Sequence, residues 1–300
     1  MPEHKRSRAY RKVINTFFPN SIMGRNSTIE WTHHTFNPWW GCAKVSDACL
    51  NCYAEAMAKR TGSLLWGTNS DRRFFGEKHW AEPLYWNKEA ERQRRHRRVF
   101  CASMADLFED RADLASWRER VWKLIQRTPW LRWLLLTKRP ENVKDMVPWE
   151  SVWPDNVWLG VTAENQEMAN KRVTALSEYP AVVRFVSCEP LLAPVDLSQW
   201  LYDRNRKKRI DWVIAGGESG SRARPVNPAW VRTLRDQCLI GKIPFHFKQW
   251  GTWLPLARKP HNENEATILR DESGQLFWIK KGKKAAGREL DRRIWDGVPA

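Results

Sequence analysis

The sequence predicts an α/β fold built on a parallel sheet that closes, fully or partly, as a TIM-type barrel. Three observations support this fold class: apolar runs rich in β-forming residues recur along the 300-residue chain, amphipathic segments separate them, and polar residues follow each run. Near-continuous apolar runs are typical of strands covered on both faces. Because strands alternate with helices, the sheet is expected to be parallel with helical crossovers.

The predicted strands are the six apolar runs at 99–104, 131–137, 157–162, 182–188, 210–215 and 243–248. An earlier strand is expected at 28–32, before the first cysteines. Helical periodicity predicts the crossovers at 112–127, 164–179 and 228–240. The last of these helices begins with Asn227 as its N-cap and Pro228 in its first turn, two residue types that favour a helix start.

Three regions are expected along the chain. Residues 1–22 are basic and lack a strand signal, which predicts either a disordered arm or a tail created by an upstream start. Residues 23–254 hold the barrel. Residues 255–300 form a small C-terminal β extension, with a hairpin whose strands lie at 266–269 and 275–280.

The composition describes a globular protein, with 42% hydrophobic and 28% charged residues. No run approaches the ~20 apolar residues of a membrane helix, and the N-terminus has no apolar signal region. We therefore expect a cytoplasmic protein without a membrane partner. Most of the 20 tryptophans are expected in the core.

The formal net charge is +17, and four segments carry almost all of it: 1–22, 88–98, 204–209 and 280–293. A near-neutral body with four basic patches indicates a polyanionic partner, because lysine and arginine clusters bind phosphates. Solubilising surface loops are the other interpretation. The residues assigned to nucleic-acid binding are Arg139, Arg204, Arg206, Lys207, Lys208 and Arg209.

Three cysteines provide the strongest chemical signal. Cys42, Cys49 and Cys52 fall within eleven residues, whereas Cys101, Cys188 and Cys238 are scattered. This spacing is typical of a metal site rather than a disulfide framework.

Three thiolates can hold a [4Fe–4S] cluster and leave one iron open to an external ligand. Zinc is the alternative if His33, His34 or a distant side chain supplies a fourth ligand. Three unligated thiols are the third possibility. The scattered cysteines are most simply buried apolar residues, and only Cys188, beside Glu189 at a strand end, is considered near the chemistry.

Several sequence blocks occur together in one order across residues 26–298. They are TIEWTHHTFNPWWGCAKVSDACLNCYAE, LLLTKRPENV, WLGVTAEN, RFVSCEPLLAPVDL, WVIAGGESGSRARPVNPAWVRTLRDQC, PFHFKQWG and GRELDRRIWDGVP. This set resembles a widespread family of phage and bacterial proteins that are described as radical-SAM-like and are often encoded near a "three-Cys-motif partner" protein. The resemblance implies a partial TIM-type barrel with a cluster at Cys42, Cys49 and Cys52, and a three-Cys-motif protein as a partner. It implies no particular reaction.

Two features depart from the usual radical-SAM pattern. Six residues separate Cys42 from Cys49, where three are usual, although the aromatic Tyr53 follows the last cysteine as in that pattern. The segment Gly216-Gly217-Glu218 resembles the one that holds the amino group of S-adenosylmethionine, but it ends a late strand instead of the second. It is expected to bind that group from another wall, to bind substrate, or to form only a tight turn.

Polar residues at the ends of the predicted strands complete the candidate site, since active sites of parallel barrels lie at the carboxyl ends of the strands. Lys138 and Arg139 are suited to a carboxylate or phosphate, and Glu189 and Glu218 to an ammonium group or ribose hydroxyls. The candidate catalytic residues are Glu189, Glu218, Lys138 and Cys188. The candidate cofactor-binding residues are Tyr53, Asp106, Glu164, Gly216, Gly217 and Glu218, with Lys248 as a further ligand contact.

These observations favour a radical enzyme that uses a [4Fe–4S] cluster and S-adenosylmethionine. A deoxyadenosyl radical would abstract hydrogen from a nucleic acid or nucleotide, in a modification or repair reaction supported by a reductant protein. The alternative is a nucleic-acid-binding protein whose cysteines form a structural zinc or iron–sulfur site without radical chemistry.

Overall fold

A computed structural model describes residues 27–149, 152–201, 210–258, 268–271, 274 and 276–300. The arm predicted at 1–22 and the basic residues Arg204, Arg206, Lys207, Lys208 and Arg209 lie outside the described residues.

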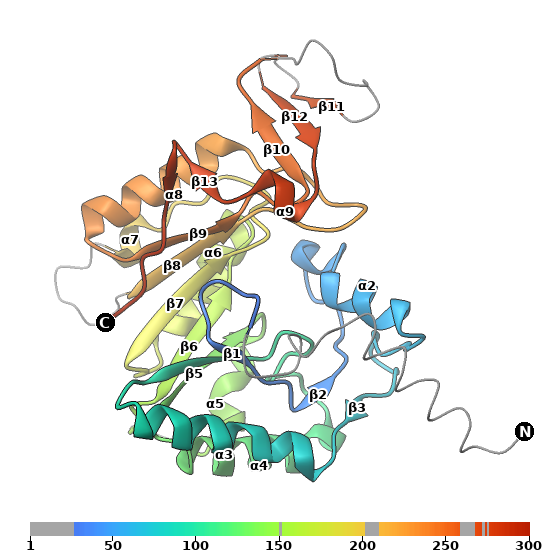
Figure 1. The fold of residues 1–300 in the computed structure, drawn as a ribbon, viewed down its shortest axis with the longest axis vertical. Coiled ribbons are helices and arrows are strands. Elements are labelled where there is room, and N and C mark those ends of the chain that lie inside the picture. Colours follow the sequence, from blue (N-terminus) through green and yellow to red (C-terminus); the bar gives the residue numbers. More distant parts are fainter. Residues whose placement is uncertain (1–26, 150–151, 202–209, 259–267, 272–273, 275) are drawn as a thin grey trace, which may run out of the picture.

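A seven-stranded parallel sheet curves into a half-barrel (Figure 1). Its strands are, in spatial order, β1 (His34–Thr35), β4 (Arg97–Cys101), β5 (Leu131–Thr137), β6 (Val157–Thr162), β7 (Val183–Cys188), β8 (Trp212–Gly216) and β9 (Phe245–Gln249). Strand β1 pairs with β4 at one edge and β9 with β8 at the other, so the two edges do not meet. This arrangement confirms the expectation of a parallel, partly closed barrel.

The six predicted strands correspond to β4 through β9, with boundaries that shift by up to three residues. The prediction of a strand at 28–32 is wrong. Those residues form a turn, in which the Thr32 amide donates to the Ile29 carbonyl at 3.1 Å, and the strand begins only at His34. The Thr32 hydroxyl also donates to the Arg98 carbonyl at 3.0 Å, which fixes the turn beside β4.

Helices cover the outer face of the sheet, as the periodicity predicts. They are α3 (Glu77–Arg92), α4 (Ala115–Gln126), α5 (Val143–Met146), α6 (Gln166–Ser177), α7 (Ser198–Leu201) and α8 (Pro228–Gly241). Short 3-10 turns lie at η1 (Asp47–Cys49), η2 (Ala112–Leu114) and η3 (Pro140–Asn142). Asn227 caps α8 by accepting a hydrogen bond from the Ala229 amide, as expected. Figure 1 shows α3 and α4 over one part of the sheet and α7 and α8 over another.

The concave face of the half-barrel is filled by aromatic side chains. Trp31, Phe100, Trp158, Phe185 and Trp212 form a buried cluster on this face. Their neighbours in the strands alternate to the other face, where they join the larger core under the helices. Gly160 is required here, because a Cβ atom at that position would lie 2.4 Å from the Phe185 ring. The aromatic filling closes the bottom of the half-barrel and leaves its carboxyl end open.

Two segments complete the fold outside the parallel sheet. Between β1 and β4 the chain forms the antiparallel pair β2 (Trp39–Trp40) and β3 (Arg73–Phe74), with helix α2 (Tyr53–Arg60) between them. After β9 it forms an antiparallel sheet of β10 (Trp253–Leu256), β12 (Phe277–Lys280) and β11 (Ile268–Arg270), then α9 (Lys283–Ala286) and the pair β13 (Glu289–Leu290) and β14 (Arg293–Ile294). The predicted hairpin is therefore present as β11 and β12.

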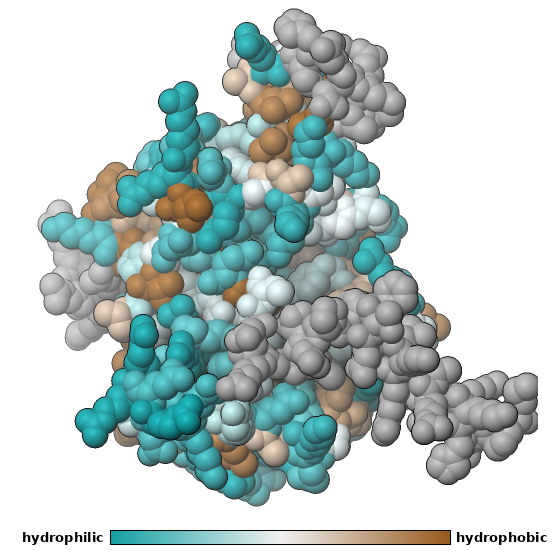
Figure 2. All heavy atoms as spheres, in the orientation of Figure 1, coloured by the Kyte–Doolittle hydropathy of each residue, from teal (hydrophilic) through white to brown (hydrophobic). Residues whose placement is uncertain are grey.

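The C-terminal residues return to the parallel sheet. The Phe247 amide donates to the Trp295 carbonyl at 3.0 Å, and the Gly297 amide donates to the Phe245 carbonyl at 2.9 Å. These bonds cover the outer edge of β9, which would otherwise expose unpaired backbone groups. The face of the molecule in Figure 2 is mainly hydrophilic, with apolar colour in small patches. Among the described helices, none combines the length and the apolar character of a membrane span.

Candidate functional site

A cavity of about 380 Å³ opens at the carboxyl ends of β4 through β9. Its apolar lining includes Trp31, Phe100 and Leu136, which belong to or pack against the aromatic cluster of the concave face. The segment with the three cysteines forms another part of its lining. The cavity therefore lies where polar residues at the strand ends were expected to meet.

Most of the predicted site residues line this cavity. They are Cys42, Cys49, Cys52, Tyr53, Asp106, Lys138, Arg139, Glu189, Gly217, Glu218 and Lys248. Sequence positions up to 206 residues apart are thus brought to one place.

Cys42 is held by two interactions at the end of β5. The Arg139 Nη1 atom lies 3.7 Å from Cys42 Sγ, and Arg139 Nη2 donates to the Ala43 carbonyl at 2.8 Å. Asp106 orients this guanidinium through a 3.0 Å ion pair. The Asp106 carboxylate also accepts from the Thr137 hydroxyl at 2.7 Å and the Lys138 amide at 3.1 Å. Asp106 and Arg139 therefore act as a clamp on the Cys42 side of the loop.

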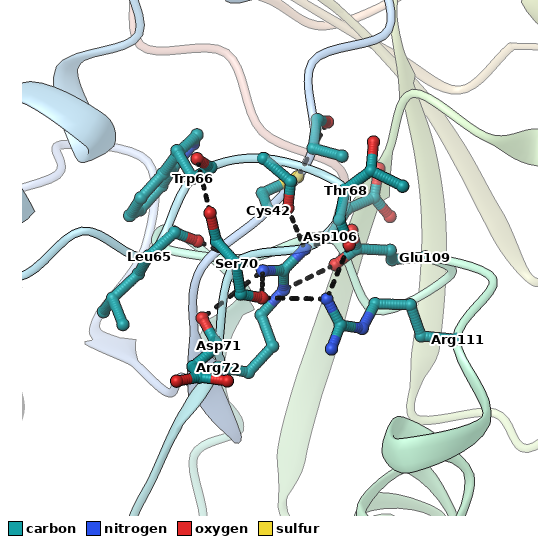
Figure 3. Close-up of polar contacts among 12 residues, drawn as sticks. Cys42, Leu65, Trp66, Thr68, Ser70, Asp71, Arg72, Asp106, Glu109 and Arg111 are labelled. Atoms are coloured by element: carbon teal, nitrogen blue, oxygen red, sulfur yellow. Dashed lines mark hydrogen bonds and ion pairs between the residues drawn. The ribbon is translucent and has the colours of Figure 1, made fainter.

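A second arginine shapes the chain around Cys42 (Figure 3). Arg72 is buried and pairs with Glu109 at 2.6 Å, and it donates to the Leu65, Gly67 and Ser70 carbonyls. The turn at Gly41 has φ +117°, and a Cβ atom there would lie 2.6 Å from the Leu65 carbonyl oxygen. Only glycine adopts this backbone conformation without strain in so narrow a space.

Cys49 and Cys52 lie on a loop that reaches the part of the sheet near β8. Cys49 ends η1 and Cys52 is the N-cap of α2. Between them, Asn51 Nδ2 donates to Glu218 Oε2 at 3.0 Å and to the Arg222 carbonyl at 2.8 Å. Arg224 Nη2 donates to the Asp47 carbonyl at 2.9 Å. The loop after β8 thus contacts the cysteine loop at two points.

The Glu218 carboxylate is occupied by protein donors. Arg224 donates to it from Nη2 at 2.7 Å, from Nε at 3.0 Å and from its amide at 2.8 Å, in addition to the bond from Asn51. Burial alone would raise the pKa of Glu218, but the hydrogen bonds from Arg224 and Asn51 outweigh burial and keep the pKa below its usual value.

Glu189 is less occupied than Glu218. Its Oε1 atom accepts from Lys248 Nζ at 2.7 Å and from Gln249 Nε2 at 3.1 Å. Among the described residues, no donor contacts its Oε2 atom. Gly216, the last residue of β8, makes room for the Glu189 side chain, since a Cβ atom at Gly216 would lie 3.3 Å from that side chain. Gly216 therefore serves the site as a neighbour and does not itself line the cavity.

Several polar groups in the cavity lack partners within the described part of the chain. Thr162 Oγ1 and Gln249 Oε1 are buried without a hydrogen bond. The ammonium groups of Lys138 and Lys283 also have no partner there. Unsatisfied buried polar atoms cost about 1–3 kcal/mol each, a cost that a bound polar ligand can remove. The cavity is therefore suited to a ligand with hydrogen-bonding groups and an anionic group.

Two predicted site residues lie behind the cavity wall. Cys188 is completely buried under the helices, because it alternates with Ser187 and Glu189, whose side chains face the cavity. Burial, with smaller contributions from Cys238 and Glu164, raises the pKa of Cys188. Glu164 is also fully buried and pairs with Arg172 of α6 at 2.7 Å. Both residues face away from the group of polar side chains that line the cavity.

Arg139 and Tyr53 have defined contacts as well. Arg139 is buried, and its guanidinium contacts Asp106, Cys42 and the Ala43 carbonyl. Tyr53 donates its hydroxyl to the Ser103 carbonyl at 2.9 Å at the rim of the cavity.

The three cysteines are unbridged thiols in the walls of one cavity. Among the described residues, no three His, Cys, Asp or Glu side chains converge closely enough to hold a metal ion. Burial, and secondarily the Asp106 carboxylate, raise the pKa of Cys42 to about 12, although the Arg139 cation opposes this rise. A bound metal would favour the thiolate and reverse the shift.

Sequence reasoning did not identify several residues of this site. Asn51, Arg72, Thr162, Arg224 and Lys283 were not singled out, although Asn51 lies between two predicted ligands. Arg72 and Arg224 act through contacts with distant segments, for which a single sequence contains no signal.

Residues 26–299 match the model of the family described as "Protein of unknown function (DUF5131)". No curated protein and no solved structure matches the chain significantly. Since the match spans more than half of its length, the chain belongs to the DUF5131 family of proteins of unknown function.

Proposed function

We propose that this protein is a radical S-adenosylmethionine-type enzyme that binds a [4Fe–4S] cluster through Cys42, Cys49 and Cys52 and modifies or repairs a nucleotide or nucleic acid. One observation carries the proposal: all three thiols line a single cavity at the carboxyl end of a parallel half-barrel. This is the end at which barrel enzymes build their active sites.

The donor set fits such a cluster. Three thiols are available, none is in a disulfide, and all three line the same cavity. Three cysteine thiolates can hold a [4Fe–4S] cluster and leave one iron open to an external ligand. Arg139, 3.7 Å from Cys42 Sγ, is a cation placed to stabilise a thiolate.

The cluster would supply one-electron reduction of the sulfonium of S-adenosylmethionine, and the protein supplies binding and orientation. Glu189 Oε2 and Gln249 Oε1 are acceptors without partners among the described residues, suited to ammonium or hydroxyl donors of a ligand. Lys248 holds Glu189 in place at 2.7 Å. The aromatic floor, with Trp31 and Phe100, excludes water from the bottom of the cavity.

The preferred substrate class follows from the unpaired cations. Lys138, at the end of β5, and Lys283, in α9, both line the cavity and have no partner within the described ranges. Lys283 has three further lysines close to it in sequence, Lys280, Lys281 and Lys284. Ammonium groups without counter-ions attract phosphates, which supports a nucleotide or a nucleic acid as the substrate.

The test uses the full-length protein, purified without oxygen and reconstituted with ferrous iron and sulfide. Wild type is expected to bind about four iron and four sulfide ions per chain and, after reduction, to cleave S-adenosylmethionine slowly to deoxyadenosine. Cys42→Ala, Cys49→Ala and Cys52→Ala should each lose the cluster, because two thiolates do not hold what three hold. Cys238→Ala is the matched control, since Cys238 is buried in α8 and does not line the cavity.

Two results would contradict the proposal in different ways. A complete, reducible cluster without deoxyadenosine formation would exclude the radical reaction but keep the cluster. Stoichiometric zinc without iron would exclude both and support a nucleic-acid-binding protein with a structural metal site.

A further inference from the structure

We infer that Glu218 and Arg224 are positioning residues that latch the Cys49 and Cys52 loop onto the loop after β8, instead of ligands for a bound molecule. The latch exists in the free protein and does not require the proposed reaction. It changes the role expected for the Gly-Gly-Glu segment from ligand binding to holding the cysteine loop.

Protein donors already make four hydrogen bonds to the Glu218 carboxylate. Its Oε2 atom accepts from Asn51, from the Arg224 amide and from Arg224 Nε, and its Oε1 atom accepts from Arg224 Nη2 at 2.7 Å. The Glu218 side chain is only 5% exposed. A ligand amine would have to displace charge-assisted hydrogen bonds, which are among the strongest in proteins.

Outside the loop after β8, the side-chain hydrogen bonds of Glu218 and Arg224 within the described residues all go to the cysteine loop. Asn51, between Cys49 and Cys52, donates to Glu218 and to the Arg222 carbonyl. Arg224 Nη2 reaches the Asp47 carbonyl at 2.9 Å. These contacts join segments 167 to 177 residues apart in sequence. They connect the cysteine loop, which follows β1 at one edge of the parallel sheet, with the loop after β8, which lies beside β9 at the other edge.

Close backbone packing near Glu218 also supports a positioning role for this residue. A Cβ atom at Gly217 would lie 2.0 Å from the Trp250 carbonyl oxygen, and one at Gly251 would lie 2.1 Å from the Glu218 carbonyl oxygen. The two glycines let these backbones touch, so the loop after β8 rests directly on the loop after β9. The latch is therefore anchored on the loop after β9.

The latch has a counterpart on the other side of the loop. Asp106 and Arg139 hold Cys42 by the same chemistry, a carboxylate that orients an arginine, which in turn bonds the backbone next to the thiol. One pair fixes Cys42 and the other fixes Cys49 and Cys52. The two pairs set the separation across the long six-residue gap between the first two cysteines.

The experiment measures the alkylation rate of each cysteine in the apoprotein by mass spectrometry. Glu218→Gln and Arg224→Met should raise the rates of Cys49 and Cys52 about tenfold, equivalent to losing one strong hydrogen bond, while the rate of Cys42 stays at its wild-type value. Arg224→Lys keeps the charge without the planar fork and should restore the rates in part. Arg232→Met is the matched control, because Arg232 makes a similar ion pair with Asp291 at 2.8 Å and neither residue lines the cavity.

Unchanged rates of Cys49 and Cys52 in the folded Glu218→Gln and Arg224→Met proteins would overturn the inference. If these variants fail to fold, Asn51→Ala, which removes only the partner on the loop, provides the same test. Binding of S-adenosylmethionine that depends on Glu218 but leaves the thiol rates unchanged would also overturn it. Because the measurement needs no metal, a wild-type protein that fails to assemble a cluster contradicts the proposed function without affecting this result.

Discussion

The protein contains two sets of three cysteines whose surroundings differ completely. Cys42, Cys49 and Cys52 lie between β1 and β4, the first two strands of the parallel sheet, and line a cavity. Cys101, Cys188 and Cys238 lie in two strands and a helix and are fully buried. The first set is surrounded by arginine–carboxylate pairs, and the second belongs to the apolar core beneath the helices.

The difference shows that the position in the fold decides what a thiol can do. A cysteine inside a core behaves as a small apolar residue, and burial raises its pKa, as it does for Cys101 and Cys188. A cysteine in a cavity wall is accessible to a ligand while hydrogen bonds hold its backbone. The contrast can be tested without knowing the reaction.

The largest expected effect is on thiol reactivity. In the native apoprotein, iodoacetamide should modify the cavity set at least about 100-fold faster than the core set, because the core thiols react only after opening events that cost several kcal/mol. Within the cavity set Cys42 should react last, since burial raises its pKa to about 12. Peptide mass spectrometry over time measures each rate. Comparable rates for the two sets would show that the cavity is not accessible.

The second effect is on the free energy of unfolding. Here substitutions in the core set are expected to cost more than substitutions in the cavity set. Cys188→Ser places a hydroxyl among apolar neighbours and should lower the free energy of unfolding by about 1–3 kcal/mol. Cys49→Ser, at a half-buried position, should change it by less than about 0.5 kcal/mol. Cys238→Ser should fall between them, because a serine in a helix can bond a carbonyl of the preceding turn. Urea unfolding of the apoproteins gives the three values, and a larger loss for Cys49→Ser would contradict the comparison.

The third effect is the pH dependence of the free energy of unfolding, to which His246 of β9 contributes because it is only 1% exposed. Burial and the nearby Arg288 lower the pKa of His246 to about 4. An unfolded histidine takes up its proton near pH 6.5, so the unfolded state binds more protons between these values and stability falls as the pH decreases from about 6.5 to 4. His246→Phe should flatten this fall by at most about 1.4 kcal/mol per pH unit.

Chemical unfolding at several pH values between 4 and 7 measures the change in slope. Part of the slope should remain in the variant, because burial and Arg98 also lower the pKa of His33 to about 4. An unchanged slope in His246→Phe would show that this histidine does not contribute to acid sensitivity.

The sequence predicted the sheet well because its strands are apolar on both faces. The runs at 131–137 and 157–162 coincide with β5 and β6 at both ends. The short strand β1 has only two residues, His34 and Thr35, so its position depends on pairing with β4 and not on a local pattern. The expected strand at 28–32 was therefore placed too early.

The candidate site could be located by the rule that strand ends converge, but the rule does not tell which way a side chain points. Ser187 and Glu189 face the cavity while Cys188 between them faces the helices. Glu164 follows β6 but pairs with Arg172 in the helix layer. The latch of Asn51, Glu218 and Arg224 could not be predicted, because it depends on contacts between distant segments.

The long sequence separation of that latch has a consequence for biosynthesis. Asn51 leaves the ribosome before Glu218, which lies 167 positions later in the chain. At about 5–20 residues per second, synthesis of the intervening chain takes roughly 10–30 s. During this interval the three thiols have been made, but the side chains that hold two of them do not yet exist. If the proposed cluster binds here, its assembly is therefore expected to follow synthesis of the loop after β8.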